Sequence, residues 1–261
     1  MILGIGIVNL YWAVTQWTLS DAGAYWNAAM RLREGAELYP ALTDVDASEV
    51  YRYAPWFAWL AVPFTFLPIQ LAGALWSAIL LAASGLAIWP LMRARAWLLV
   101  AFFAPILIGI SAVGNVQALM IAWLLHGVER RSGPLWIALA ASLKVTPILL
   151  AAVYAGKRQF GRVAATLALA ALLWAPVLLY DLSGYVTSAG QAASLVQVPI
   201  LYVVVTGGLV LLTLTVAAGR FGWLAGSVAT VVALPRLFVY DVSFLMLGTL
   251  PVTGRDGEPP R

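Results

Sequence analysis

The chain contains no cysteine, so it can form neither a disulfide nor a thiolate metal site. Charged residues are also scarce: they make up 10% of the 261 residues, and a single histidine is present. Hydrophobic residues reach 63%, a share that excludes an ordinary soluble domain. The net charge of +4 comes from short basic clusters between apolar runs. This pattern indicates orientation in a membrane and excludes a nucleic-acid-binding surface.

The composition therefore predicts an all-α, polytopic transmembrane protein embedded in the lipid bilayer. We expect one transmembrane domain over residues 1–252 and a disordered polar tail over residues 253–261. Residues 1–19 have about the ~20 apolar residues that a spanning helix needs. The start of the chain lacks a basic segment and a small-residue cleavage site, so we expect this helix to be retained.

Seven further apolar runs follow, and two of them are interrupted. One is broken near Lys144 and Pro147, and the last is broken at Pro235 and Arg236. Before these runs, residues 53–67 are apolar but short, so this segment either re-enters or crosses as a tilted, partial span. The seven runs are residues 69–92, 97–113, 116–128, 134–156, 163–180, 199–218 and 223–252.

Basic clusters follow several of these runs, and they predict the orientation of the chain. With every basic cluster on the cytoplasmic side, the N-terminus lies inside and residues 20–53 lie outside. The loops near Asn115 and Ser183 would face outward as well. The loop near Arg236 is a further candidate for the outer side.

Residues 20–53 form an acidic, aromatic-rich segment in this apolar chain. Within it, residues 21–34 have helical periodicity, with Asp21 and Tyr25 on one face, and Gly35 is a typical helix stop. We expect a helix that lies along the membrane surface. A carboxylate held close to hydrocarbon is costly, so this segment is the candidate functional loop. It holds six of the chain's eleven acidic residues: Asp21, Glu34, Glu37, Asp44, Asp46 and Glu49.

Four blocks of sequence resemble a known family. SDAGAYWNAAMRLREGAELY, with the later YRYAPWFAWLAVPFTFLP, resembles the opening of glycosyltransferase family 87, in the GT-C superfamily of membrane enzymes. The blocks GNVQALMIAWLL, LAASLKVTPILL and PRLFVYDV follow in the family's order. One departure lies in the second block, where Gly114-Asn115 replaces the glycine-glutamine pair common in the family.

The resemblance implies a GT-C-like fold and a defined reaction. A hexose, with mannose as the expected sugar, would pass from a polyprenyl-phosphate donor to a glycolipid or cell-envelope glycan. The reaction would take place on the outer face of a bacterial plasma membrane, without cofactor or metal. Asp21 matches the acidic residue of the first outer loop that acts in the family as general base.

The chemistry of the donor agrees with a single catalytic carboxylate. The leaving group is already an acidic phosphodiester, so it needs cations and donors around it but no general acid. The acceptor hydroxyl needs a base, and one carboxylate suffices for a single displacement with inversion. Asp21 has an alternative role as the N-cap of the surface helix.

The remaining candidates are expected to bind the substrate. Arg52 and Arg236 are predicted to contact the donor phosphate, and Lys144 either joins them or pairs with a buried acid such as Asp241. An internal ion pair among Arg236, Tyr240 and Asp241 is the alternative for that group. The full set of predicted substrate-binding residues is Tyr25, Arg31, Arg52, Tyr53, Asn115, Gln117, Lys144, Arg236, Tyr240 and Asp241.

One possible metal motif and two other classes of function remain to be weighed. Asp44 and Asp46 have the spacing of the Asp-x-Asp metal motif, but in a polar loop we expect them to be solvated, and no metal site is predicted. A transporter or flippase would also place ionisable residues in broken helices, with Lys144 and Asp241 as its candidates. A non-catalytic membrane partner is the third class of function.

Overall fold

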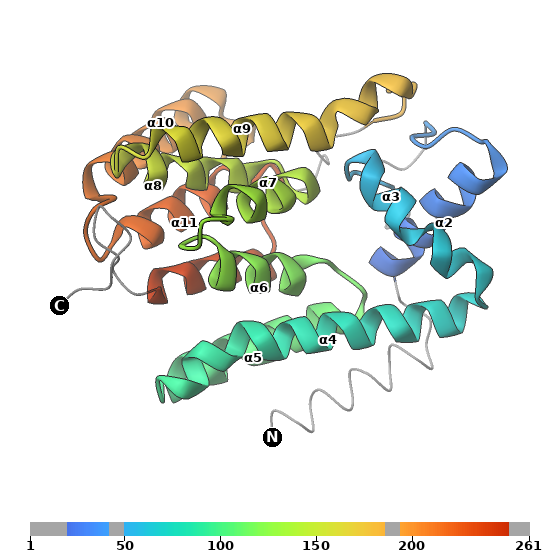
Figure 1. Cartoon of the computed structure of the whole chain (residues 1–261), viewed down its shortest axis with the longest axis horizontal. Coiled ribbons are helices and arrows are strands. Elements are labelled where there is room, and N and C mark those ends of the chain that lie inside the picture. The colour runs from blue at the N-terminus through green and yellow to red at the C-terminus, as the bar shows by residue number, and fades with distance from the viewer. Residues whose placement is uncertain (1–19, 42–49, 186–193, 251–261) are drawn as a thin grey trace. The chain divides into compact units, whose positions relative to one another are not determined.

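The computed structural model describes residues 20–41, 50–185 and 194–250, and it is all-helical, with 76% helix and no strand in that part of the chain (Figure 1). The all-α prediction is confirmed. The expected first helix, the polar tail, Asp44 and Asp46 lie outside the described residues. The α-helices are α2 (Ser20–Glu34), α3 (Pro55–Ala61), α4 (Ile69–Arg93), α5 (Trp97–Ala112), α6 (Gln117–Gly127), α7 (Gly133–Leu143), α8 (Ala151–Gly156), α9 (Phe160–Trp174), α10 (Pro199–Val216) and α11 (Gly222–Val232). The 3₁₀ helices are η1 (Val62–Phe66), η2 (Thr146–Leu150), η3 (Ala175–Leu179), η4 (Leu195–Gln197) and η5 (Val239–Thr249).

The chain forms two compact units, and their boundary falls within α6. The first unit comprises Met1–Ala122 with Trp174–Gly190, and the second comprises Trp123–Leu173 with Gln191–Arg261. Each unit is described by itself below. That the two together make one transmembrane domain stays a prediction.

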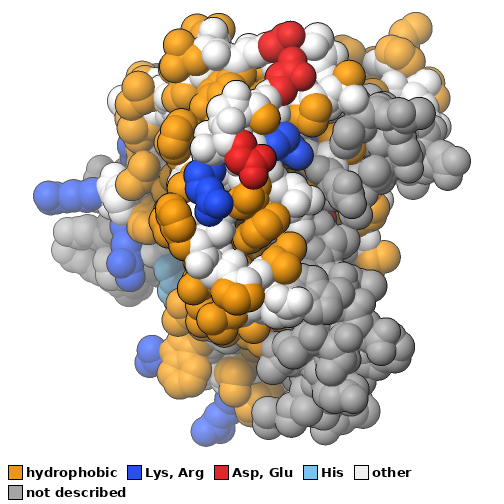
Figure 2. All heavy atoms as spheres, turned by 90° about the vertical axis from the view of Figure 1, so that its right-hand side faces the viewer, with side chains coloured by type: hydrophobic (Ala, Val, Ile, Leu, Met, Phe, Trp, Pro, Cys, Tyr) orange, Lys and Arg blue, Asp and Glu red, His pale blue; other side chains and the backbone are white. Residues whose placement is uncertain are grey.

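Three helices in the described part are long and apolar enough to cross a membrane. They are Ile69–Arg93, Phe160–Leu179 and Pro199–Val216, and they correspond to three of the predicted spans. Many of their apolar side chains face outward; Leu179 is 84% exposed and Ile200 is 81% exposed. Figure 2 shows one face of the molecule, on which hydrophobic side chains lie beside acidic and basic ones. The outward-facing apolar side chains of the three long helices suit contact with lipid and not with water.

The predicted interruptions are present as well. Residues 53–67 form the seven-residue α3 and the five-residue η1, with Pro55 in the first turn of α3 and Pro63 in that of η1. The run 134–156 breaks at Lys144, whose extended backbone ends α7, and continues as η2 and α8. The break leaves the Lys144 side chain at a helix end, where its charge can meet a partner.

In the first unit, α4 and α5 pack as a hairpin, and α2 packs on α3, η1 and α4. The buried hydroxyls of Ser84 and Ser111 lie 2.9 Å apart and bond to each other across the hairpin. Ala28 and Ala29 of α2 are fully buried, and such small side chains let the helix approach its neighbours closely.

In the second unit, α11 packs against α10, η2 and η5. Its buried hydroxyls satisfy themselves within the helix: Ser227 donates to the Trp223 carbonyl and Thr230 to the Gly226 carbonyl. Thr213 of α10 does the same with Leu209. Bonds of this kind let polar residues sit in apolar surroundings without an unpaired donor.

The turn between α5 and α6 lies directly on α2, in the first unit. Gly114 has φ 87°, a conformation that strongly favours glycine, and the Trp76 indole N–H donates to its carbonyl at 2.8 Å. A Cβ atom at Gly114 would lie 2.5 Å from the Cβ of Ala22. This turn therefore needs glycine both for its backbone and for its contact with α2.

We expect Gly114→Ala to destabilise the protein by about 2 kcal/mol or more, because a left-handed alanine alone costs about 1–2 kcal/mol and the overlap with Ala22 adds to it. Thermal unfolding in detergent micelles measures the change. Gly85→Ala in α4 is the matched control, since a Cβ atom there meets open space. Equal melting temperatures for the two variants would contradict the role given to Gly114.

Candidate functional site

Asp21 in the first turn of α2 meets Asn115 in the turn before α6. The Asn115 side-chain N–H donates to Asp21 Oδ2 at 2.8 Å, and the Gln117 backbone N–H donates to Asn115 Oδ1 at 2.8 Å. Because the Oδ1 atom is engaged by an N–H donor, the amide must present its NH₂ group to the carboxylate. Asn115 is only 3% exposed, and its side chain is held by both contacts.

Three of the predicted site residues thus come together: Asp21, Asn115 and Gln117. Residues 21 and 115 are 94 apart in sequence, and the tight Gly114 turn brings them into contact. The helix dipole adds to the arrangement, since a negative charge in the first turn of a helix is favourable. A carboxylate held in one orientation beside a polar donor is able to accept a proton from a bound hydroxyl.

Tyr25 lies one turn after Asp21 and is buried. Its hydroxyl donates to the Tyr53 hydroxyl at 3.1 Å, and its ring meets Phe57 and Trp76 edge-on. Burial, followed by the charges of Tyr53 and Asp21, raises the pKa of Tyr25 well above 10. Tyr25 therefore remains a neutral hydrogen-bond donor beside the carboxylate at physiological pH.

Tyr53 and Arg52 lie within a cluster of tyrosines that the sequence analysis did not predict. The Tyr39 hydroxyl donates to the Tyr53 carbonyl at 2.8 Å, and the Tyr185 hydroxyl donates to the Arg52 carbonyl at 3.2 Å. The Tyr51 hydroxyl donates to the Ala54 carbonyl at 2.9 Å. These bonds fix the segment that follows the acidic loop. The sequence shows that tyrosines are frequent around Arg52. It does not show which of them contact one another.

Arg52 and Arg31, two predicted contacts of the substrate, also lie in this unit. The Arg52 guanidinium donates to the Val50 carbonyl at 3.3 Å. Arg31 is half-buried near the C-terminal end of α2, nearly three turns beyond Asp21. The contacts of neither residue test whether it meets a phosphate, so both assignments stay predictions.

The other four candidates lie in the second unit. Lys144 Nζ is 2.5 Å from Asp241 Oδ1, and the Asp241 side chain is fully buried. Asp241 Oδ2 accepts the Phe238 backbone N–H at 2.9 Å, at the start of η5. Of the two roles predicted for Lys144, the structure forms the ion pair with Asp241. Removing one partner of such a pair would leave an unpaired buried charge.

Aromatic rings stand beside this pair. Lys144 Nζ lies 4.6 Å from the centre of the Tyr240 ring, and the Arg236 guanidinium carbon lies 5.2 Å from the centre of the Phe238 ring. The Phe238 and Tyr240 rings stack with centres 5.2 Å apart. Lys144 and Arg236 thus both lie near aromatic rings at breaks in apolar runs. Phosphate binding and ion-coupled transport would both need cations at such places.

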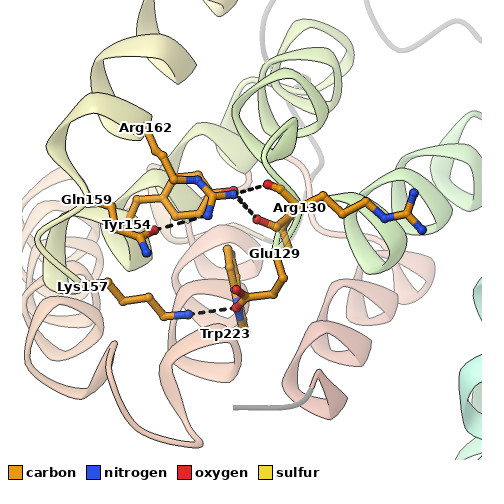
Figure 3. Close-up of polar contacts among 8 residues, drawn as sticks. Glu129, Arg130, Tyr154, Lys157, Gln159, Arg162 and Trp223 are labelled. Atoms are coloured by element: carbon orange, nitrogen blue, oxygen red, sulfur yellow. Dashed lines mark hydrogen bonds and ion pairs between the residues drawn. The ribbon is translucent and has the colours of Figure 1, made fainter. Parts of the chain in front are cut away.

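A second polar cluster in this unit was not predicted (Figure 3). Lys157 Nζ is 2.8 Å from Glu129 Oε1, and the Trp223 indole N–H donates to the same oxygen. Arg162 donates to the carbonyls of Val128 and Arg130 at 2.7 and 2.6 Å. The cluster joins the loop after α6 to the ends of α8 and α11. The sequence showed these residues only as basic clusters that set orientation.

Metal ligands are not grouped in residues 20–41, 50–185 and 194–250, where no three His, Cys, Asp or Glu side chains lie close enough to hold an ion. Asp44 and Asp46 fall between the described segments. The expectation of a metal-free reaction therefore stays a prediction.

Over residues 20–41, 50–185 and 194–250, the chain is thus all-helical, with three helices able to span a membrane and a half-buried carboxylate on the segment after the first expected span. Comparisons with models of protein families, with characterised proteins and with solved structures gave no match.

The buried tyrosines give a prediction for the dependence of stability on pH. Burial raises the pKa of Tyr25, Tyr39, Tyr51 and Tyr185, so the folded state holds protons that the unfolded state releases near pH 10. Their contribution to stability is complete below about pH 10 and is lost as the pH rises through the raised folded pKa values. We expect the melting temperature in micelles to fall steeply above that pH.

Tyrosinate absorbance measures the same event directly. Part of the tyrosine signal should titrate normally and the rest only as the protein unfolds. Complete titration near pH 10 with the fold intact would contradict the prediction. Tyr51→Phe, which removes one buried hydroxyl, should make the fall in melting temperature shallower.

Proposed function

We propose that this protein is a membrane glycosyltransferase of the GT-C type, similar to family 87, that uses a polyprenyl-phosphate sugar. The observation that supports this most is the Asp21 carboxylate, oriented by Asn115 on the segment predicted to face outward. The donor would be a polyprenyl-phosphate hexose, with mannose as the expected sugar. The acceptor would be a glycolipid or cell-envelope glycan on the outer face of a bacterial plasma membrane.

The reaction is a single displacement at the anomeric carbon. The acceptor hydroxyl oxygen forms a bond to that carbon, and the bond from the carbon to the phosphate oxygen breaks. The polyprenyl phosphate leaves with the electron pair, and the hydroxyl proton passes to Asp21. Inversion at the anomeric carbon follows from attack opposite to the leaving group.

The charge that develops on the leaving phosphate needs cations. Arg52, in the same unit as Asp21, is our candidate, with Tyr53 and Gln117 as further contacts of the substrate. That Arg236 and Tyr240 contact the donor as well stays a prediction from the sequence. Lys144 already has a partner in Asp241, which favours a supporting role for this pair.

The grouping of loops supports the proposed orientation. In the first unit, the acidic segment, the Asn115 turn and the residues near Tyr185 contact one another. In the second unit, the basic segments near Glu129, Lys157 and Arg162 also gather. Loops expected on one side of the membrane thus lie together within each unit.

A transporter is the second candidate, and the Lys144–Asp241 pair at the break after α7 favours it. Transfer of labelled hexose from polyprenyl-phosphate mannose to a lipid extract, by purified protein in nanodiscs, separates the two functions. Uptake of solute by proteoliposomes without any hexose transfer would favour the transporter.

We expect Asp21→Asn to lower the rate of transfer by about 10²–10⁴-fold, because it removes the base and keeps the shape of the side chain. Asn115→Ala should lower the turnover number less, with little change in the KM for the donor, because it frees the carboxylate without removing it. Both rates are measured with labelled donor in nanodiscs.

Asp181→Asn is the matched control, since Asp181 is an exposed carboxylate of the same unit, bonded to the Ser183 N–H. It should transfer hexose at the wild-type rate. Near-normal turnover in Asp21→Asn would refute the assignment of the base and point to Asp44 or Asp46.

We also expect transfer to continue without divalent metal, because a lipid monophosphate donor presents no diphosphate for an ion to bridge. Rates are measured after treatment with EDTA and after addition of Mg²⁺ or Mn²⁺. Activity lost with EDTA and restored by either ion would overturn this expectation and make Asp44 and Asp46 the first residues to replace.

A further inference from the structure

A cavity of about 40 Å³ lies in the first unit, against the face of α2 that also carries Tyr25. Side chains from α2, α3, η1 and α4 line it, and it is partly open, with the 54% exposed Leu60 among the lining residues. None of the described residues around it is acidic or basic. Gly23, Trp26, Ile69 and Trp76 belong to this lining.

The size and lining of the cavity fit a few methylene groups of a hydrocarbon chain. The volume equals the room for roughly three water molecules, but a water site needs two or more polar partners, and apolar cavities stay dry and take up apolar ligands. The rings of Phe64 and Trp76 meet edge-on with centres 6.2 Å apart and give the cavity a rigid wall. A sugar ring, with its many hydroxyls, would find few partners here.

One polar atom of the lining indicates which polar group the ligand carries. The Trp26 indole N–H is buried and has no hydrogen-bond partner among the described residues. By contrast, Trp76 donates to the Gly114 carbonyl and Trp59 to the Tyr180 hydroxyl. A buried donor without an acceptor is costly, so a ligand that offers an oxygen atom to Trp26 would gain a hydrogen bond.

The position along α4 gives the depth of the cavity in the bilayer. Ile69 and Trp76 come from the first two turns of α4, one of the three candidate spans. The start of a spanning helix lies at the boundary between the hydrocarbon and the head groups, where tryptophan is enriched. In a glycerolipid, that boundary holds the ester carbonyls, each followed directly by an acyl chain.

We propose that this cavity binds one acyl chain of a glycerolipid, whose ester carbonyl accepts the Trp26 indole N–H. A polyprenyl phosphate fits less well, because its only oxygens belong to a charged phosphate and no cation lines the cavity. The site is a lipid-binding site in its own right and does not depend on the transfer of a sugar.

Gly23 provides a variant that fills the cavity. It lines the cavity, and no heavy atom lies within 4 Å of the position that its Cβ would take. Gly23→Leu should therefore occupy the space without displacing a neighbour. Gly85→Leu is the matched control, because Gly85 also faces open space but lies on the exposed side of α4, away from the cavity.

The experiment is photo-crosslinking in nanodiscs of phosphatidylcholine with a diazirine near the carbonyl end of one acyl chain. Peptide mapping by mass spectrometry should find the label on α2, η1 and the first turns of α4. Gly23→Leu should lose most of this label, and Gly85→Leu should keep it. Trp26→Phe should weaken retention of the lipid by about 2–10-fold, the worth of one neutral hydrogen bond.

Labelling of the exposed α10 is the internal standard and should be the same in all variants. Unchanged labelling of α2 in both Gly23→Leu and Trp26→Phe would overturn the proposal. Displacement of the label by polyprenyl phosphate at lower concentration than by unlabelled phosphatidylcholine would overturn the choice of an acyl chain. Trp26→Phe removes the N–H donor together with part of the ring and leaves the cavity unfilled, so it keeps the test valid if Gly23→Leu does not fold.

Discussion

In a chain with so few charges, a charged side chain that is withdrawn from water needs a partner within the protein. The described part meets this constraint in three places: Asp21 with Asn115, Lys144 with Asp241, and Lys157 with Glu129. Each bond joins segments far apart in sequence, so these contacts decide which helices pack together. Hydrophobic contact alone selects partners weakly among helices that are nearly all apolar.

The sequence predicted the helices better than their partners. Apolar run length predicted the ends of the three candidate spans of the described residues within a few residues. Gly35, Lys144 and Pro235 marked real ends or breaks of helices, because these signals act locally. The division into two compact units was not expected. It depends on which helices touch, and the run lengths contain no information on that.

The candidate site shows the same limit. Asp21, Tyr25 and Asn115 were each singled out, but the bond from Asn115 to Asp21 needs the left-handed Gly114 and its contact with Ala22. The Glu129–Lys157 pair was not predicted, because the basic residues at helix ends were interpreted only as signals of membrane orientation. Nor could the sequence show the unpartnered N–H of Trp26, since that depends on every neighbour of the ring.

The carboxylates of Asp21 and Asp241 differ in their burial and in the kind of group that holds them. Asp241 meets an ammonium group at 2.5 Å, so the charge of the pair is already balanced, and the pair is suited to fix the broken helix. Asp21 is half-buried and accepts the side-chain N–H of Asn115, which sets its orientation. A general base must be within reach of the acceptor hydroxyl. The partial exposure of Asp21 therefore favours it over the fully buried Asp241 as the candidate for proton transfer, with Asn115 as the candidate for its positioning residue.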